Sequence, residues 1–201
     1  MRLHEARKDY YRRLARQEGY ASRAAYKMAQ LDTKYHIIHE GGRVLDLGCS
    51  PGGWSQVACE RVGEFGLVVG VDVTPVSFSN DNFRFILGDV LSDILPAVTA
   101  ASREFDCVVS DLSPKVSGIW EVDSGRQIDL SKAAFGVAGR VLKAGGSSVY
   151  KAFQGEFTDE LISLVKSRFD RVVLAKPEAS RKKSSEIYLV CLGFRPDRAP
   201  A

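Results

Sequence analysis

The chain has no long apolar run, and this absence excludes a membrane-spanning protein. No segment is apolar over the length that a transmembrane helix needs. The first residues, MRLHEARKDYYRRLARQEGY, also lack the apolar stretch of a secretory signal peptide. We therefore expect a cytoplasmic protein without a membrane partner.

Cysteine and histidine are also scarce, which argues against disulfides and metal sites. These residues are Cys49, Cys59, Cys107, Cys191, His4, His36 and His39. The cysteines are widely spaced, form no CxxC pair and mostly lie in or beside apolar segments, so we expect reduced, buried thiols. The histidines are too few and too poorly grouped to form a ligand set, and we expect no metal.

The rest of the composition is that of an ordinary globular protein. With 201 residues, 45% of them hydrophobic and 26% charged, the chain is long enough to bury one core of sheet and helices. We expect a single domain, in which a basic helical segment (1–36) precedes an α/β core (37–194) and a frayed tail (195–201).

Positive charge is concentrated in two short segments. Residues 1–27 hold eight Lys or Arg against three acids, a charge of +5, so the remainder carries −2 of the total of +3. A second basic cluster, Arg181–Lys183, stands in SRKKSSE. Two basic segments on a slightly acidic body favour a polyanionic partner. The first segment alone is equally consistent with a solvated helix face.

Hydrophobic patterning predicts alternating strands and helices. We expect strands at 43–48, 67–72, 83–89, 105–112, 146–153, 170–175 and 186–194, and helices at 4–17, 21–35, 53–62, 92–100, 124–142 and 157–168. Near-continuous apolar character in the early strands indicates a mostly parallel sheet with helices on both faces. No helix separates the last two strands, so we expect one of them to run antiparallel.

The stretch VLDLGCSPGGWSQVACE is the first element that suggests a ligand site. A strand ends on Asp46, a glycine-rich turn follows, and a helix begins near Trp54. Such glycines let the backbone approach a ligand closely. The stretch is neither a P-loop nor a G-x-G-x-x-G turn.

Acids at the next two strand ends strengthen this interpretation. Asp72 ends VVGVD twenty residues after Gly52, and Asp89 ends the third strand. The first acid is suited to the hydroxyls of a ribose and the second to an adenine amino group. Either could be a turn-forming Asp, but a glycine loop and two acids in succession favour adenosine binding.

These residues lie within a longer resemblance. SRAAYKMAQLD, DLGCSPGGWSQ, GVDVTP, GDV, SDLSPKVSG, KAFQGE and KPEASRKKSSEIYLVC occur in the order and spacing of the FtsJ/RrmJ (RlmE) family, which this chain resembles over nearly its whole length. Members are ribosomal RNA 2′-O-ribose methyltransferases. The resemblance implies a Rossmann-like class I S-adenosylmethionine domain, with a seven-stranded, mostly parallel sheet and an antiparallel last strand.

The resemblance also assigns site residues. Those implied for S-adenosylmethionine are Gly48, Gly52, Gly53, Trp54, Asp72, Asp89, Val90 and Asp111. The family's catalytic Lys-Asp-Lys-Glu set falls on Lys27, Asp111, Lys151 and Glu186, with Lys151 as the proton acceptor. Small departures at Cys49, Ser50 and Lys115 could alter cofactor affinity or RNA contacts.

Physical chemistry explains why a charged residue ends the strand SSVYKAF. A ribose 2′-hydroxyl is a poor nucleophile until its proton has an acceptor, and a lysine serves only if it is neutral when the reaction begins or if it stabilises the alkoxide electrostatically. Burial and a neighbouring Lys27 favour the neutral form, whereas Asp111 and Glu186 oppose it and fix the amine in place. An antiparallel last strand brings Glu186 to the same sheet edge as Asp111 and Lys151.

The function that the resemblance implies is 2′-O-methylation of a uridine in 23S-type large-subunit rRNA, presented in a ribosomal particle. The two basic segments would contact phosphates, and Tyr10, Tyr11 and Trp120 are suited to base stacking or to core packing. We expect a monomer. Methylation of a tRNA anticodon loop and a non-catalytic role in ribosome assembly remain alternatives, whereas a small-molecule O-methyltransferase would not need the basic segments.

Overall fold

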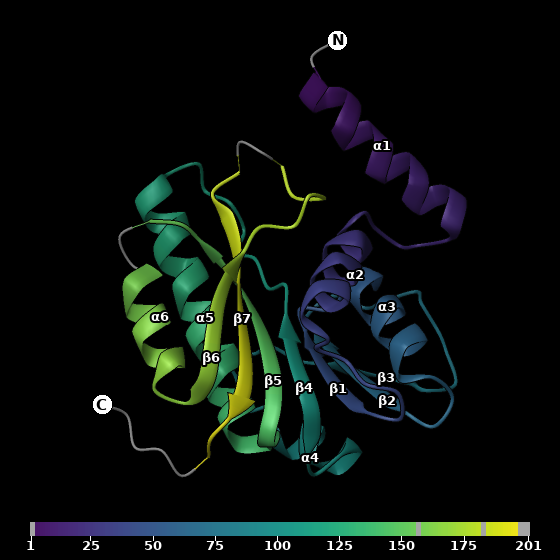
Figure 1. The fold of residues 1–201 in the computed structure, drawn as a ribbon, viewed down its shortest axis with the longest axis vertical. Helices are drawn as coiled ribbons and strands as arrows, with labels where there is room; N and C mark the ends of the chain where they lie inside the picture. The colour runs from purple at the N-terminus through teal and green to yellow at the C-terminus, as the bar shows by residue number, and fades with distance from the viewer. Residues whose placement is uncertain (1–2, 156–157, 182–183, 197–201) are drawn as a thin grey trace.

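One seven-stranded sheet forms the centre of the molecule (Figure 1). In this computed structural model, residues 3–155, 158–181 and 184–196 are described, with side chains from residue 10 onward. The strands are β1 (Arg43–Leu47), β2 (Leu67–Asp72), β3 (Phe83–Leu87), β4 (Phe105–Ser110), β5 (Leu142–Phe153), β6 (Phe169–Ala175) and β7 (Glu186–Phe194). Their order across the sheet is β3-β2-β1-β4-β5-β7-β6.

Strand β7 alone runs against the other six. Pairing is parallel from β3 through β2, β1 and β4 to β5, whereas β7 is antiparallel to both of its neighbours, β5 and β6. A parallel pair needs a long crossover, usually a helix, and the described residues between β6 and β7 form none, so the chain reverses there. The predicted mostly parallel sheet with an antiparallel last strand is confirmed.

Helices cover both faces of the sheet. They are α1 (Leu3–Glu18), α2 (Ala24–Tyr35), α3 (Gly53–Val62), α4 (Leu95–Ala101), α5 (Trp120–Val141) and α6 (Thr158–Lys166). Helices α2 and α3 pack on one face, and α4, α5 and α6 on the other, each over its own apolar cluster (Figure 1). No helix in the described part of the chain is both long enough and apolar enough to cross a membrane.

The alternation of side chains along β5 decides which face Lys151 occupies. Successive strand residues point to opposite faces. Val149 packs into the cluster beneath α2 and α3, whereas Tyr150 packs into the cluster beneath α5. Lys151 therefore shares the face of Val149, where α2 lies.

Helix α1 projects from the body beyond α2 (Figure 1). Tyrosines connect it to α2: the rings of Tyr11 and Tyr26 lie 5.3 Å apart, and the hydroxyl of Tyr26 donates to Glu18 at 2.7 Å. The connection between the helices is fixed by Gln56 of α3, whose amide bonds the carbonyl of Gly19 and the N–H of Ala21. The position of α1 thus depends on polar and aromatic contacts near its carboxyl end.

Two element boundaries differ from the sequence prediction by four residues, and the others differ by three or fewer. Helix α5 begins at Trp120, not at 124, because the buried carboxylate of Asp123 accepts hydrogen bonds from Ser117 and Gly118 just before it. Strand β5 begins at Leu142, which already pairs with Phe105 before a shift in register. This early part of the strand was not predicted, because Gly145 and Gly146 are typical of a turn.

The chain ends and the cysteines can be placed in part. Arg195, in the predicted tail, pairs with Asp170 at 3.0 Å, and its N–H donates to the carbonyl of Arg168; residues 197–201 lie outside the described residues. All four cysteines are buried and free, as expected.

Candidate active site

Four charged side chains meet at the carboxyl edge of the sheet. Lys27 comes from α2, Asp111 follows β4, Lys151 lies near the end of β5, and Glu186 begins β7. They form two ion pairs: Lys27 Nζ lies 2.8 Å from Glu186 Oε1, and Lys151 Nζ lies 3.3 Å from Asp111 Oδ1. We call these four residues the tetrad.

Tyr188 connects the two ion pairs and was not predicted from the sequence. Its hydroxyl accepts a hydrogen bond from Lys27 Nζ at 3.1 Å and donates one to Asp111 Oδ1 at 2.9 Å. Tyr188 also pairs directly across the sheet with Lys151. Its place two residues after Glu186, on the same face of a strand, is the signal that could have revealed it.

Burial makes these contacts strong. Lys27 and Lys151 are only 6% and 7% exposed, so a charge on either amine needs a partner. Burial would raise the pKa of Glu186, but the charge and hydrogen bond of Lys27, the charge of Lys151 and a hydrogen bond from Ser180 hold it below its ordinary value. Glu186 is therefore a carboxylate at neutral pH.

The backbone of Lys151 is held from the opposite face of the sheet. Gln127 Nε2 and Ser131 Oγ, both on α5, donate to the carbonyl oxygen of Lys151 at 3.1 and 2.7 Å. The amine of Lys151 also donates to the carbonyl of Asp111 at 3.2 Å. These contacts fix the strand end on which the amine is carried.

A cavity of about 530 Å³ adjoins the tetrad at the same edge. Five of the predicted cofactor residues line it: Gly48, Asp72, Asp89, Val90 and Asp111. Gly48 has a φ of +82°, and a Cβ there would lie 2.9 Å from the backbone and side chain of Leu112, so only glycine fits. Asp111 belongs to both the cavity and the tetrad, and it joins a ligand site to the two lysines.

The acids that line the cavity still have free hydrogen-bond acceptor positions for a ligand. Asp72 accepts one hydrogen bond on each oxygen, from the N–H of Ser50 and of Thr74, and Asp89 accepts one on Oδ1 from Leu91. A carboxylate has about four acceptor positions. Both acids can therefore still accept from hydroxyl or amino groups, which fits the adenosine of S-adenosylmethionine.

The other three predicted cofactor residues lie outside the lining of this cavity. A Cβ on Gly53 would be 2.6 Å from Ser22 Oγ and 3.1 Å from the N of Ala25, so Gly53 permits the close approach of α2 and α3. Trp54 is buried, and its ring lies 5.5 Å from that of Tyr188. Gly52 caps α3 with a φ of +120°. Gly53 and Trp54 thus pack against α2 and β7, which carry tetrad residues.

The buried acid Asp46 lies beneath the glycine loop. Its Oδ2 accepts a short hydrogen bond of 2.6 Å from Ser55 Oγ, while Oδ1 has no partner among the described residues. Burial, together with the charges of Asp111 and Asp72, raises the pKa of Asp46 to about 7, against the opposing hydrogen bond of Ser55.

The strand order and directions define the class I S-adenosylmethionine-dependent methyltransferase fold. Fibrillarin of Aeropyrum pernix, solved with S-adenosyl-L-methionine bound, superimposes with a TM-score of 0.60 over 84% of this chain and 76% of that chain. Its sequence identity is 17%, so the likeness concerns the fold alone.

The sequence comparison is more specific. The FtsJ-like methyltransferase model matches residues 20–194, and the chain belongs to this family. Ribosomal RNA large subunit methyltransferase E of Cenarchaeum symbiosum is 49% identical over 197 residues, covering 97% of this chain and all of that protein. A Plasmodium falciparum protein described as a ribosomal RNA methyltransferase has a TM-score of 0.77 and 29% identity, covering 87% of this chain and 98% of that one.

Proposed function

We propose that this protein methylates the 2′-oxygen of a uridine in large-subunit ribosomal RNA, with S-adenosylmethionine as methyl donor and the ribosomal particle as substrate. The observation that carries this proposal is the continuous polar chain Glu186–Lys27–Tyr188–Asp111–Lys151, which ends at a cavity with acids suited to adenosine. The relative named ribosomal RNA large subunit methyltransferase E, which matches nearly the whole chain, supports the choice of RNA.

The residues of the cavity fit the cofactor. Asp72 would accept from the ribose hydroxyls and Asp89 from the adenine amino group, while Gly48 lets the backbone approach. Bound S-adenosylmethionine would supply an activated methyl group, which the ribose oxygen takes as its bond to sulfur breaks.

Within this proposal Lys151 handles the proton. For this role the amine of Lys151 must first release its own proton to solvent; as the ribose oxygen then bonds to the methyl carbon, its proton passes to that amine, which leaves a methyl ether and an ammonium. Asp111 and the carbonyl beside it hold that amine in place, and the ammonium formed is stabilised by the carboxylate 3.3 Å away. Lys27 is held by Glu186 and Tyr188 and keeps the carboxylate of Glu186 paired.

The test is transfer of labelled methyl groups to large ribosomal subunits that lack the modification. Wild type and Lys151→Ala are compared with Lys132→Ala, which removes a lysine paired with Glu160 on the surface. General-base catalysis contributes about 10²–10⁴-fold in rate, so Lys151→Ala should lose at least 10²-fold while Lys132→Ala keeps its rate.

Three other results would change the proposal. Label on tRNA alone would keep the reaction and replace the substrate. Equal rates for wild type and Lys151→Ala would remove the proposed proton acceptor. Absence of transfer, with S-adenosylmethionine still raising the melting temperature of the wild type, would favour a non-catalytic assembly factor.

A further inference from the structure

Four arginines from three separate segments line a second cavity. Arg12 and Arg16 come from α1, Arg23 precedes α2, and Arg181 lies in the β6–β7 connection. The cavity has a volume of about 430 Å³, and no acid stands among the described residues that line it. We call this feature the arginine pocket.

Collecting these charges is electrostatically unfavourable in the free protein. Burial and the charges of Arg181 and Arg12 lower the pKa of Arg23. The charge of Glu186 opposes this lowering of the Arg23 pKa, but the Glu186 carboxylate is already bound by Lys27 and Ser180. A bound anion would offset the mutual repulsion, so the arrangement points to an anionic ligand rather than to a contribution to folding stability.

The arginine pocket adjoins the tetrad. Arg23 precedes Lys27 by four positions, and residues with this spacing lie about 6 Å apart on one face of a helix. Arg181 follows Ser180, whose hydroxyl donates to Glu186 at 2.8 Å. Lys27 and Glu186, which form one ion pair of the tetrad, are therefore each close to an arginine of the pocket.

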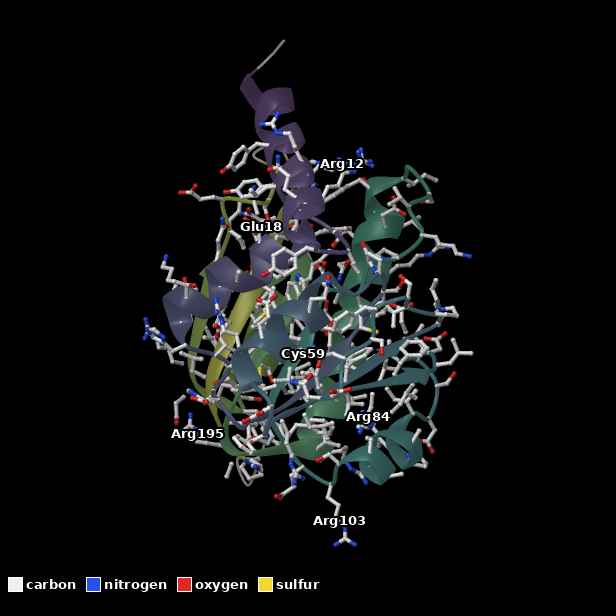
Figure 2. All side chains as sticks on the ribbon, turned by 90° about the vertical axis from the view of Figure 1, so that its right-hand side faces the viewer. Arg12, Glu18, Cys59, Arg84, Arg103 and Arg195 are labelled. Atoms are coloured by element: carbon white, nitrogen blue, oxygen red, sulfur yellow. The ribbon has the colours of Figure 1, made fainter. Side chains whose placement is uncertain are left out.

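The scaffold of the pocket is fixed before any ligand arrives. Gln56 holds the α1–α2 connection at Gly19 and Ala21, and the hydroxyl of Tyr20 donates to Glu60 at 2.8 Å. Arg12 lies at the α1 end of the molecule and Arg103 at the opposite end (Figure 2). The pocket, which Arg12 helps to line, therefore lies toward the α1 end of the molecule.

We propose that the arginine pocket binds a backbone phosphate of the RNA strand close to the ribose being methylated. Guanidinium groups bind phosphate oxygens with paired N–H donors, and such contacts fix register without reading bases. The inference rests on the proposed function and adds a defined site: α1 and the β6–β7 connection hold one phosphate together, and its distance from Lys151 sets which ribose reaches the amine. Lys182 and Lys183, expected to contact RNA, lie outside the described residues.

The test compares two variants that lose the same charge. The pocket variant, Arg16→Gln with Arg181→Gln, removes two of the four arginines that line the pocket. The control variant, Arg84→Gln with Arg103→Gln, removes two arginines at the other end of the molecule (Figure 2). Equilibrium binding to unmodified large subunits is measured from low to high salt, and methyl transfer is measured separately. Near-UV circular dichroism confirms that each variant is folded.

For the pocket variant we expect subunit binding at least tenfold weaker, KM raised to match, and kcat within about twofold of the wild type. Each lost phosphate contact should reduce the slope of log K against log salt by about 0.7–0.9. The control variant should bind within about twofold of the wild type.

The outcomes separate the two proposals. Equal losses in both variants would show that only overall charge matters, and unchanged binding in the pocket variant would show that no phosphate is held there; either result overturns the inference. A wild type that binds subunits but never methylates them would overturn the proposed function, while the two variants would still decide the pocket.

Discussion

Asp46→Asn should change how the stability of the protein depends on pH. The carboxyl group is fully buried, with one oxygen bonded to Ser55 and the other unpartnered among the described residues. Burial raises its pKa from 3.8 to about 7. Between these values the folded protein keeps a proton that the unfolded chain has released, so this group makes the fold less stable as pH rises through that window.

The magnitude follows from the size of the shift. One unit of pKa difference corresponds to about 1.4 kcal/mol. From pH 5 to pH 7, about two units of the window are crossed, so Asp46 should cost the wild type roughly 3 kcal/mol of unfolding free energy that an asparagine does not. Above pH 7 the carboxylate is ionised in both states, and the difference should stop growing.

The assay is urea unfolding of wild type and Asp46→Asn at pH 5, 6, 7 and 8, followed by tryptophan fluorescence. The free energy of Asp46→Asn minus that of the wild type should rise by roughly 3 kcal/mol across this range. Ser55→Ala removes the hydrogen bond that favours the carboxylate, so it should raise the pKa of Asp46 further and extend the loss of stability to higher pH. Parallel pH profiles, or a carboxyl carbon of Asp46 that titrates near pH 4 by NMR, would refute the reasoning.

Two further substitutions test the packing around the tetrad. Tyr188→Phe removes the hydrogen bonds of the hydroxyl to Lys27 and Asp111 and should lower the free energy of unfolding by about 2–4 kcal/mol. Urea titrations measure this loss, and a value below about 0.5 kcal/mol would show that the two ion pairs hold without the Tyr188 hydroxyl. Gly53→Ala should cost about 1–3 kcal/mol, because its Cβ would press on the start of α2. The control is Gly136→Ala on the open face of α5, which should stabilise the protein by about 0.5–1 kcal/mol. Equal effects of Gly53→Ala and Gly136→Ala would contradict the packing argument.

Much of the fold could be predicted because its signals are local. Apolar runs, glycine turns and the missing helix before β7 give the element order and the antiparallel last strand. The start of β5 could not be predicted, because Gly145 and Gly146 resemble a turn while the pairing of Leu142 with Phe105 is a long-range contact. Similarly, the first turn of α5 depends on a buried carboxylate, Asp123, whose partners precede the helix.

The site divides in the same way. Asp72 and Asp89 could be predicted as cavity residues because parallel strands bring their carboxyl ends to one edge. The position of Tyr188 on the same strand face as Glu186 was a usable signal, but its contact with Lys27 depends on which helix covers that face, and so does the packing role of Gly53. The arginine pocket was even less accessible, because Arg16 and Arg181 meet only in the folded chain.

The place of β7 in the sheet has a consequence for how the chain matures. Lys27 and Tyr188 touch although they lie 161 positions apart in the sequence. During synthesis, β1 to β5 and the helices around them can assemble while the edge of β5 is still unpaired and Lys27 has no carboxylate to bind. Only the last strand, entering between β5 and β6, closes the sheet and supplies both Glu186 and Tyr188. A nascent chain that stops short of β7 should therefore be inactive and prone to pair its open strand edge with other chains.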